Sequence, residues 1–116
     1  MITEGLGQRR FHGRVVLLVN EHIACAVEMV SAFAEENNLA TIVGTKTPRR
    51  LLSGSAYNVG HGYILGLPVA AYLTWQRRML ENNGIVPKFF IELSREALKQ
   101  GRNTQLETAI QVAKAL

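Results

Sequence analysis

The sequence is poor in several features that define common protein classes. Cys25 is its one cysteine in 116 residues, which excludes an internal disulfide and fits a reducing compartment, so we expect a cytoplasmic protein. No charged leader precedes an apolar segment, and no apolar run approaches bilayer length, so we expect no membrane partner. The three histidines show no ligand spacing, and neither a GxGxxG nor a Walker loop is present. We therefore expect no metal and no cofactor.

Charge of either sign is sparse and dispersed. Apolar residues make up 47% of the chain and charged residues 19%, a composition typical of one globular domain. The net charge of +4 invites a nucleic-acid interpretation, but the basic residues cluster only as three arginine pairs and do not interleave with aromatic residues. We expect no nucleic-acid partner, and that alternative rests on charge alone. Residues 1–12 read as a lead-in segment and residues 13–116 as the domain.

The most informative stretch is a junction between a strand and a helix. Val15 to Val19 is a short run that is apolar on both faces, as in a sheet covered on both sides. Asn20 to Ala24 is a polar turn. From Cys25 the period becomes helical, and it predicts one apolar stripe made of Ala26, Met29, Val30, Phe33, Ala34 and Asn37.

Cys25 therefore occupies the first turn of the predicted helix. Free backbone N–H groups and the positive end of the helix dipole converge there, which favours a thiolate. The N–H of Ala26 is a natural donor to an oxyanion that develops beside such a nucleophile. His22 lies three residues before Cys25 and Glu28 three residues after it, so a pairing of thiol and imidazole is conceivable. The alternative is that Cys25 is a small buried hydrophobe.

The middle of the chain predicts a strand and a hairpin. Ala40 to Val43 continues the strand and helix into a parallel unit. The basic segment from Gly44 to Ser55 is either a functional loop or a solvated connection. The runs 56–59 and 63–73 flank a Gly-His-Gly turn and predict a β-hairpin, in which Pro68 marks an edge or a bulge.

The last part predicts a strand and two helices. Phe89 to Leu93 is apolar, and Ser94 caps a short helix over residues 95–99 that Gly101 ends. Thr104 and Glu107 form a capping box for a final helix. Its expected buried face consists of Leu106, Ile110, Ala113 and Leu116. Together the elements predict an α/β fold.

Several motifs in register resemble the tail-specific, or C-terminal processing, serine peptidases and their tricorn-like relatives. The run from Val15 to Gly44 resembles the family's nucleophile region, in which a strand and a T-A-S-A-x-E turn precede a helix, and Cys25 falls on the nucleophilic serine. Gly44, Thr47 and Arg50 resemble a G-x-x-T-x-G-R loop. The segments that follow are similar to the family's hairpin, its L-E-x-x-G-V-x-P motif and its G-x-D-x-Q-L-x-x-A terminus.

The resemblance implies a fold of the ClpP/crotonase kind, with stacked ββα units forming part of a catalytic domain, and hydrolysis of a peptide or protein substrate. Cys25 would be the nucleophile and Ala26 the oxyanion donor, with Thr47 and Arg50 in the substrate-binding loop. In the tricorn-like branch a carboxylate assists a histidine, and Glu81 occupies that region. Arg50 stands where the other branch has a lysine base and cannot accept a proton, so the tricorn-like branch is favoured. The histidine should come from an earlier segment.

The chain also departs from the family pattern. Cysteine replaces the serine, Arg49 and Arg77 replace glycines, and Lys88 and Asn103 replace aspartates. A cysteine is a competent nucleophile when a base is present. The alternative is a non-catalytic remnant that binds peptides or another subunit. Because half a domain leaves strand edges and apolar faces uncovered, we also expect a homo-oligomer.

Overall fold

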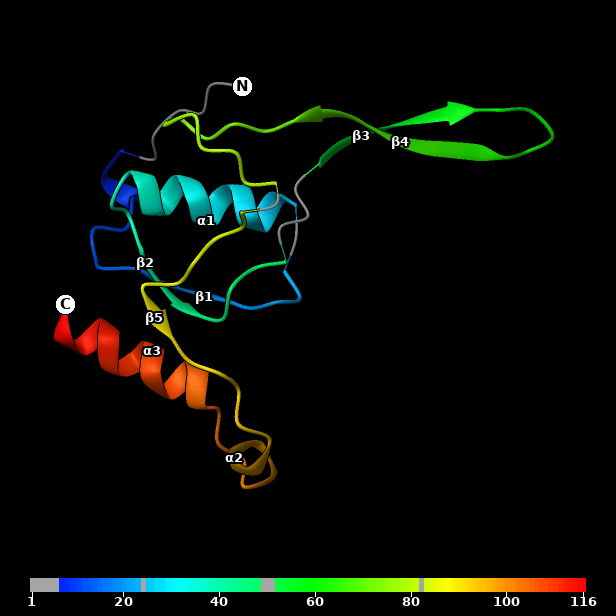
Figure 1. The fold of residues 1–116 in the computed structure, drawn as a ribbon. Coiled ribbons are helices and arrows are strands. Elements are labelled where there is room, and N and C mark those ends of the chain that lie inside the picture. The colour runs from blue at the N-terminus through cyan, green and yellow to red at the C-terminus, as the bar shows by residue number, and fades with distance from the viewer. Residues whose placement is uncertain (1–6, 24, 49–51, 82) are drawn as a thin grey trace.

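A three-stranded parallel sheet forms the centre of the molecule. The computed structural model describes residues 7–23, 25–48, 52–81 and 83–116 (Figure 1). Strands β1 (Val16–Val19), β2 (Thr41–Gly44) and β5 (Phe89–Phe90) lie in the order β1-β2-β5, all parallel. Val16 pairs with Thr41 and Val43 with Phe89. The predicted parallel unit is confirmed, although β5 is shorter than expected.

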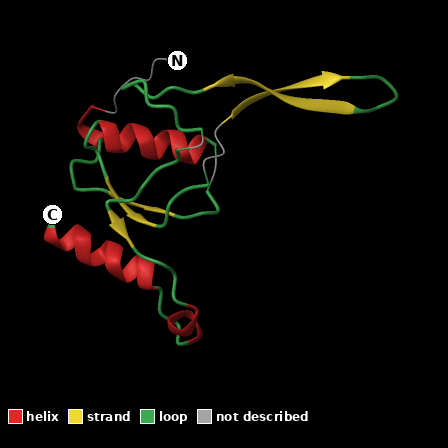
Figure 2. Ribbon diagram, viewed as in Figure 1, coloured by secondary structure: helices red, strands yellow, loops and turns green. Residues whose placement is uncertain are grey.

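Helices cover the sheet on both faces. Helix α1 (Ala26–Glu36) lies on one side and α3 (Thr104–Ala115) on the other, as Figure 2 shows, and the short helix α2 (Arg95–Lys99) and the 3-10 turn η1 (Gly7–Arg9) lie outside this stack. The mixed α/β prediction is confirmed. The finer assignment to stacked ββα units of the ClpP/crotonase kind stays a prediction. Within the described part of the chain, no helix combines the length and apolarity needed to cross a bilayer.

Each face of the sheet has its own small core, and β2 contributes to both. Ile42 packs on the α1 side and Val43 on the α3 side, because neighbouring strand residues point in opposite directions. The α1 side is completed by Val19, Ala32, Leu80 and Ile85, and the α3 side by Ala109 and Val112.

Helix α1 does not bury the face that its sequence predicts. Its buried residues are Glu28, Ser31, Ala32 and Ala34, whereas the apolar Met29, Val30 and Phe33 are exposed. The prediction of a core-facing apolar stripe is therefore wrong for all but Ala34. Small and polar side chains let the helix approach the sheet closely, and the larger apolar side chains are left toward solvent.

Helix α3 also buries a different face from the one that its sequence predicts. Gln105, Ala109 and Val112 are buried, whereas Leu106 and Ile110 are exposed, so the predicted buried face is wrong by one residue. Leu116 alone of the expected set packs partly against the core. The capping box is also wrong, because the Asn103 side chain accepts the hydrogen bond from the Leu106 N–H at 2.9 Å.

A β-hairpin projects from the body of the molecule (Figure 1). Its strands β3 (Leu52–Asn58) and β4 (Ile64–Ala71) are antiparallel, and all of β4 is exposed. The register shifts between Ser53 and Gly54, opposite Pro68, where a bulge was predicted. The hairpin prediction is confirmed, with a longer first strand than expected.

Other predicted turns are also confirmed. Ser94 caps α2 by accepting a hydrogen bond from the Ala97 N–H at 3.2 Å, and Gly101 follows α2 with φ of 74°. The structure also shows that Asn38, directly after the C-cap Asn37 of α1, has a left-handed backbone with φ of 55°. Arg77, which stands where the related family has glycine, also keeps a left-handed backbone, with φ of 60°.

Candidate active site

Cys25 lies at the strand-to-helix junction in an unusual backbone conformation. It is the N-cap of α1, with φ of 55° and ψ of −118°, and its side chain is exposed. A non-glycine residue rarely adopts these angles, and they cost free energy that the surrounding structure must supply. A sharp strained turn of this kind between a strand and a helix presents the nucleophile in hydrolases. Cys25 is therefore an accessible thiol and not the buried hydrophobe of the alternative interpretation.

The loop that leads to Cys25 is fixed by hydrogen bonds. The His22 N–H donates to the Asn20 side chain at 2.9 Å, and the Thr45 hydroxyl donates to the Glu21 carboxylate. This hydrogen bond lowers the pKa of Glu21. The His22 ring is 81% exposed and lies 3.4 Å from Glu21. The contact found for the His22 ring is thus with Glu21, and among the described residues no hydrogen bond or ion pair joins that ring to Cys25.

Ala26 begins α1 immediately after the thiol. The Cys25 carbonyl accepts the first helical hydrogen bond, from the Met29 N–H at 3.2 Å. No hydrogen bond from the Ala26 N–H is found among the described residues. As at other helix starts, this donor is available to an anion. The placement fits the oxyanion role that the sequence suggested for Ala26, which stays a prediction.

A buried polar network joins the first turn of α1 to two other segments. Glu28 is fully buried, and its carboxylate accepts a hydrogen bond from the Thr47 hydroxyl, which is itself 2% exposed. The same hydroxyl accepts from the Ile85 N–H at 2.9 Å, and the Thr47 N–H donates to the Ile85 carbonyl at 3.2 Å. These contacts occupy Thr47 within the protein and favour a positioning role over direct contact of its side chain with substrate.

The remaining predicted site residues are not joined to the thiol by a described contact. Glu81 is half-buried in the turn between Leu80 and Gly84, and no hydrogen bond or ion pair of its side chain is found within the described residues. That turn leads directly to Ile85 and hence to the buried network. Arg50 and Arg49 lie outside the described residues, so their predicted roles stay predictions.

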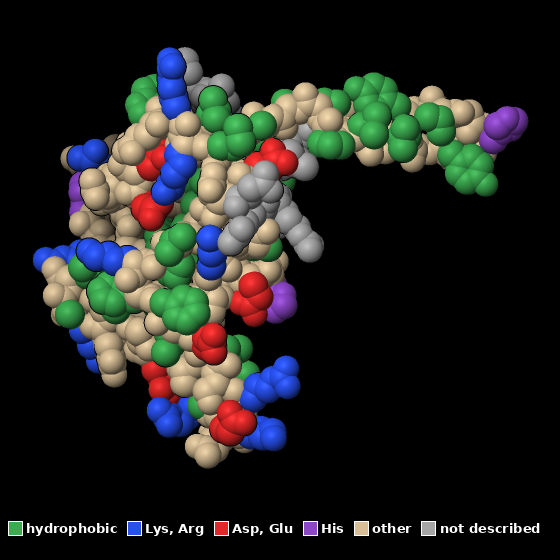
Figure 3. Space-filling model, in the orientation of Figure 1, with side chains coloured by type: hydrophobic (Ala, Val, Ile, Leu, Met, Phe, Trp, Pro, Cys, Tyr) green, Lys and Arg blue, Asp and Glu red, His purple; other side chains and the backbone are tan. Residues whose placement is uncertain are grey.

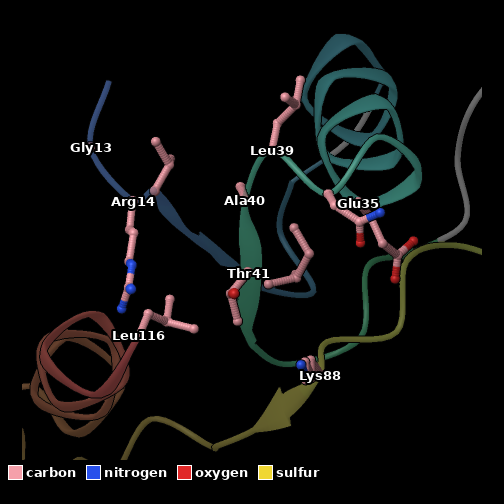
Figure 4. Close-up of a pocket in the computed structure, with 11 residues that line it drawn as sticks. Gly13, Arg14, Glu35, Leu39, Ala40, Thr41, Lys88 and Leu116 are labelled. Atoms are coloured by element: carbon pink, nitrogen blue, oxygen red, sulfur yellow. The ribbon is translucent and has the colours of Figure 1, made fainter. Parts of the chain in front are cut away.

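Two hollows lie at opposite edges of the sheet. Figure 4 shows one of about 530 Å³, lined by Arg14, Leu39, Thr41 and Lys88 among others, at the amino ends of β1 and β2. Another, of about 420 Å³, lies at the carboxyl ends of the strands and is lined by Asn20, Glu21, His22, Thr45, Lys46, Phe90, Glu92, Leu93 and Gln105. Ligands of parallel sheets bind at the carboxyl edge, and Cys25 follows β1 on that edge. The first hollow, despite its size, is on the wrong edge for chemistry at Cys25.

Glu28 was missed as a site residue. Its signal in the sequence is a single carboxylate inside the otherwise uncharged segment from Ala24 to Ala34, three residues after the thiol. A charge in that position is more often solvated than buried, so the pattern alone did not assign it a partner.

Among the described residues, no cluster of His, Cys, Asp and Glu could hold a metal ion.

Comparisons with known proteins identify the family of the chain. The model of peptidase family S41 matches residues 3–91 of the chain. A carboxyl-terminal-processing protease of Synechocystis sp. is 33% identical over 78 residues, which cover 67% of this chain and 18% of that protein.

Two solved structures share the fold. The tricorn protease superimposes with a TM-score of 0.79 at 22% identity, over 86% of this chain and 10% of its own. The photosystem II D1 C-terminal processing protease gives a TM-score of 0.58 at 23% identity, over 67% of this chain and 20% of its own. The chain thus spans about a fifth or less of the relatives compared.

Proposed function

Because the chain belongs to peptidase family S41, we propose that it carries the nucleophile-bearing part of a site that hydrolyses peptide bonds. The backbone of Cys25 carries this proposal, because a strained N-cap that exposes a thiol has no evident structural purpose. The substrate would be a peptide or protein. The hollow at the carboxyl edge of the sheet, the edge at which Cys25 follows β1, would hold part of it.

The proposed reaction is acyl transfer to sulfur. The Cys25 sulfur attacks the carbonyl carbon, a C–S bond forms, and the carbonyl oxygen becomes an oxyanion that the Ala26 N–H and the start of α1 stabilise. Collapse breaks the C–N bond, and the amine leaves with the proton that a histidine took from the thiol. Water then hydrolyses the thioester and restores the thiol. Glu81 is assigned to orient that histidine, as the family resemblance implies.

The buried network would keep this arrangement in place. Glu28 lies in the same helical turn as the oxyanion donor, and Thr47 ties it to Ile85, four residues after Glu81. The network therefore links the segment with the nucleophile to the segment with the proposed orienting carboxylate.

A second candidate function is non-catalytic binding of peptides or of another subunit. The exposed apolar side chains of α1 and of the hairpin favour it, because such surfaces mark interaction sites. In this case Cys25→Ala would bind peptides as the unchanged protein does, and neither would hydrolyse them.

The test uses the fact that Cys25 is the single thiol. The rate of alkylation by iodoacetamide at neutral pH should be several-fold higher in the folded protein than in urea, where the same thiol lacks the helix. Hydrolysis of fluorogenic peptides with apolar C-termini should be lost in Cys25→Ala and retained in part by Cys25→Ser. Equal turnover by Cys25→Ala would overturn the catalytic proposal.

A further inference from the structure

The proposed reaction needs a histidine that takes the proton of the Cys25 thiol, and the family resemblance derives it from an earlier segment. This chain has three histidines of its own. His61 lies in the turn between β3 and β4, and Figure 3 shows a histidine at that end of the hairpin, far from the body. His12 comes before β1 and accepts a hydrogen bond from the Arg10 side chain at 3.4 Å. His22 alone follows β1, at the edge of the sheet to which Cys25 belongs.

The backbone keeps His22 close to the thiol. The two residues are three positions apart, so their Cα atoms are separated by at most about 11 Å even in a fully extended chain. The chain is not extended here, because the Ile23 N–H donates to the Asn20 carbonyl at 3.4 Å. Both the His22 ring and the Cys25 side chain are exposed. Exposed side chains change rotamer within nanoseconds, so the ring is free to turn toward the thiol.

A carboxylate already faces one nitrogen of the His22 ring. The Nε2 atom of His22 lies 3.4 Å from the Glu21 carboxylate. That carboxylate is held in turn by the hydroxyl of Thr45, the residue directly after β2, and this hydrogen bond lowers the pKa of Glu21. An ionised carboxylate stabilises the imidazolium that forms when a histidine takes a proton. Because Nε2 faces Glu21, Nδ1 is the ring nitrogen left for a second partner.

The other charged groups beside this ring come from two further segments. The hollow that His22 and Glu21 line also receives Lys46, from the loop after β2, and Glu92, which follows β5. Helix α3 contributes the uncharged Gln105. The two carboxylates and the one ammonium leave the hollow with a net negative charge while His22 is neutral. A positive charge on the ring is therefore favoured by its surroundings.

We propose that His22 accepts the proton of the Cys25 thiol and that Glu21 orients the His22 ring. The S–H bond breaks, the proton moves to Nδ1 of His22, and the electron pair stays on sulfur, which becomes a thiolate. The imidazolium then lies between the thiolate and the Glu21 carboxylate until it gives the proton to the leaving amine. Glu21 thus takes the orienting role that the resemblance gives to Glu81. The inference rests on the proposed function for the chemistry at sulfur, and it assigns the histidine that this function requires.

The test follows alkylation of Cys25 by iodoacetamide as a function of pH, because this reaction reports the thiolate and needs no peptide substrate. His22→Gln keeps a polar side chain but removes the proton acceptor. At neutral pH it should lower the rate about fivefold or more. At about pH 10, where an ordinary thiol is ionised without a base, the variant and the unchanged protein should react equally. His12→Gln and His61→Gln are the matched controls and should keep the unchanged pH profile.

Glu21→Gln tests the orienting carboxylate, and it should lower the rate at neutral pH by a smaller factor, about twofold. Circular dichroism would verify that each variant folds, which these exposed positions should permit. Equal rates at neutral pH for His22→Gln and the unchanged protein would overturn the inference and leave the proposed function with a histidine from another segment. A rate that falls equally at about pH 10, or equally in His12→Gln and His61→Gln, would overturn it as well. Peptide hydrolysis by Cys25→Ala does not enter this test, so the two proposals can fail separately.

Discussion

Thr47 and Glu28 are hydrogen-bonded in the interior of the protein, with the hydroxyl donating to the carboxylate. The two residues come from the loop after β2 and from the first turn of α1. The hydroxyl also accepts the Ile85 N–H, so one side chain connects three segments. Buried polar groups of this kind contribute most through the penalty of leaving a partner unsatisfied.

Replacing Thr47 by valine keeps the shape of the side chain and removes the hydroxyl. The buried Ile85 N–H then loses its acceptor, and we expect a loss of about 2 kcal/mol in the free energy of unfolding, measured by urea denaturation. The rate of Cys25 alkylation below the unfolding transition should fall as well, because the first turn of α1 loses its anchor. Thr47→Ser, which retains the hydroxyl, is the control, and equal rates in the two variants would refute the positioning role.

Gly44 should tolerate no side chain. Its φ is 129°, and a Cβ built on it would lie 1.9 Å from the Val19 carbonyl oxygen of the paired strand. Gly44→Ala should therefore separate the ends of β1 and β2 and cost about 3 kcal/mol or more. Gly66→Ala is the matched control, because no atom lies within 4 Å of its Cβ. Thermal unfolding of both variants measures the difference, and similar melting temperatures would contradict the argument.

Arg77 has a left-handed backbone conformation that glycine would adopt with less strain. With φ of 60° it lies in the left-handed region, where the Arg77 N–H donates to the Thr74 carbonyl at 2.9 Å. Arg77→Gly should relieve about 1 kcal/mol of backbone strain, less the entropy that glycine adds to the unfolded chain. We expect a small net stabilisation in urea titration. Arg77→Ala removes the same charge without the relief, and an equal gain there would point to charge instead.

The contribution of Glu21 to stability should depend on pH, and the Thr45 hydroxyl should determine that dependence. The Thr45 hydroxyl lowers the pKa of the Glu21 carboxyl, so the contact stabilises the fold above the ordinary glutamate pKa and is lost as pH falls through the folded value. Thr45→Val should raise the pKa of Glu21 toward that ordinary value. NMR titration of the side-chain carboxyl carbon measures it. Thr108→Val, remote on α3, should leave the titration unchanged, and no shift in Thr45→Val would refute the cause.

The sequence predicted the local structure better than the packing. The strand, turn and helix around Cys25, the hairpin with its bulge near Pro68 and the cap at Ser94 all follow from turn chemistry and periodicity, which act within a few residues. The buried faces of α1 and α3 were wrong, because periodicity locates an apolar stripe but does not identify the molecule that covers it. The hydrogen bond between Thr47 and Glu28 was not predicted, since it joins residues from separate elements.

The central strand β2 couples the stability of the two faces of the sheet. Ile42 and Val43 are adjacent in β2, yet each belongs to a different hydrophobic cluster. Neither helix can detach without exposing one side of the same four-residue segment, so the two halves should melt together as one cooperative unit. A molecule that binds α3 should thus slow amide exchange in α1. In the same way, a ligand that binds at Cys25 should slow amide exchange in α3, on the opposite face of the sheet.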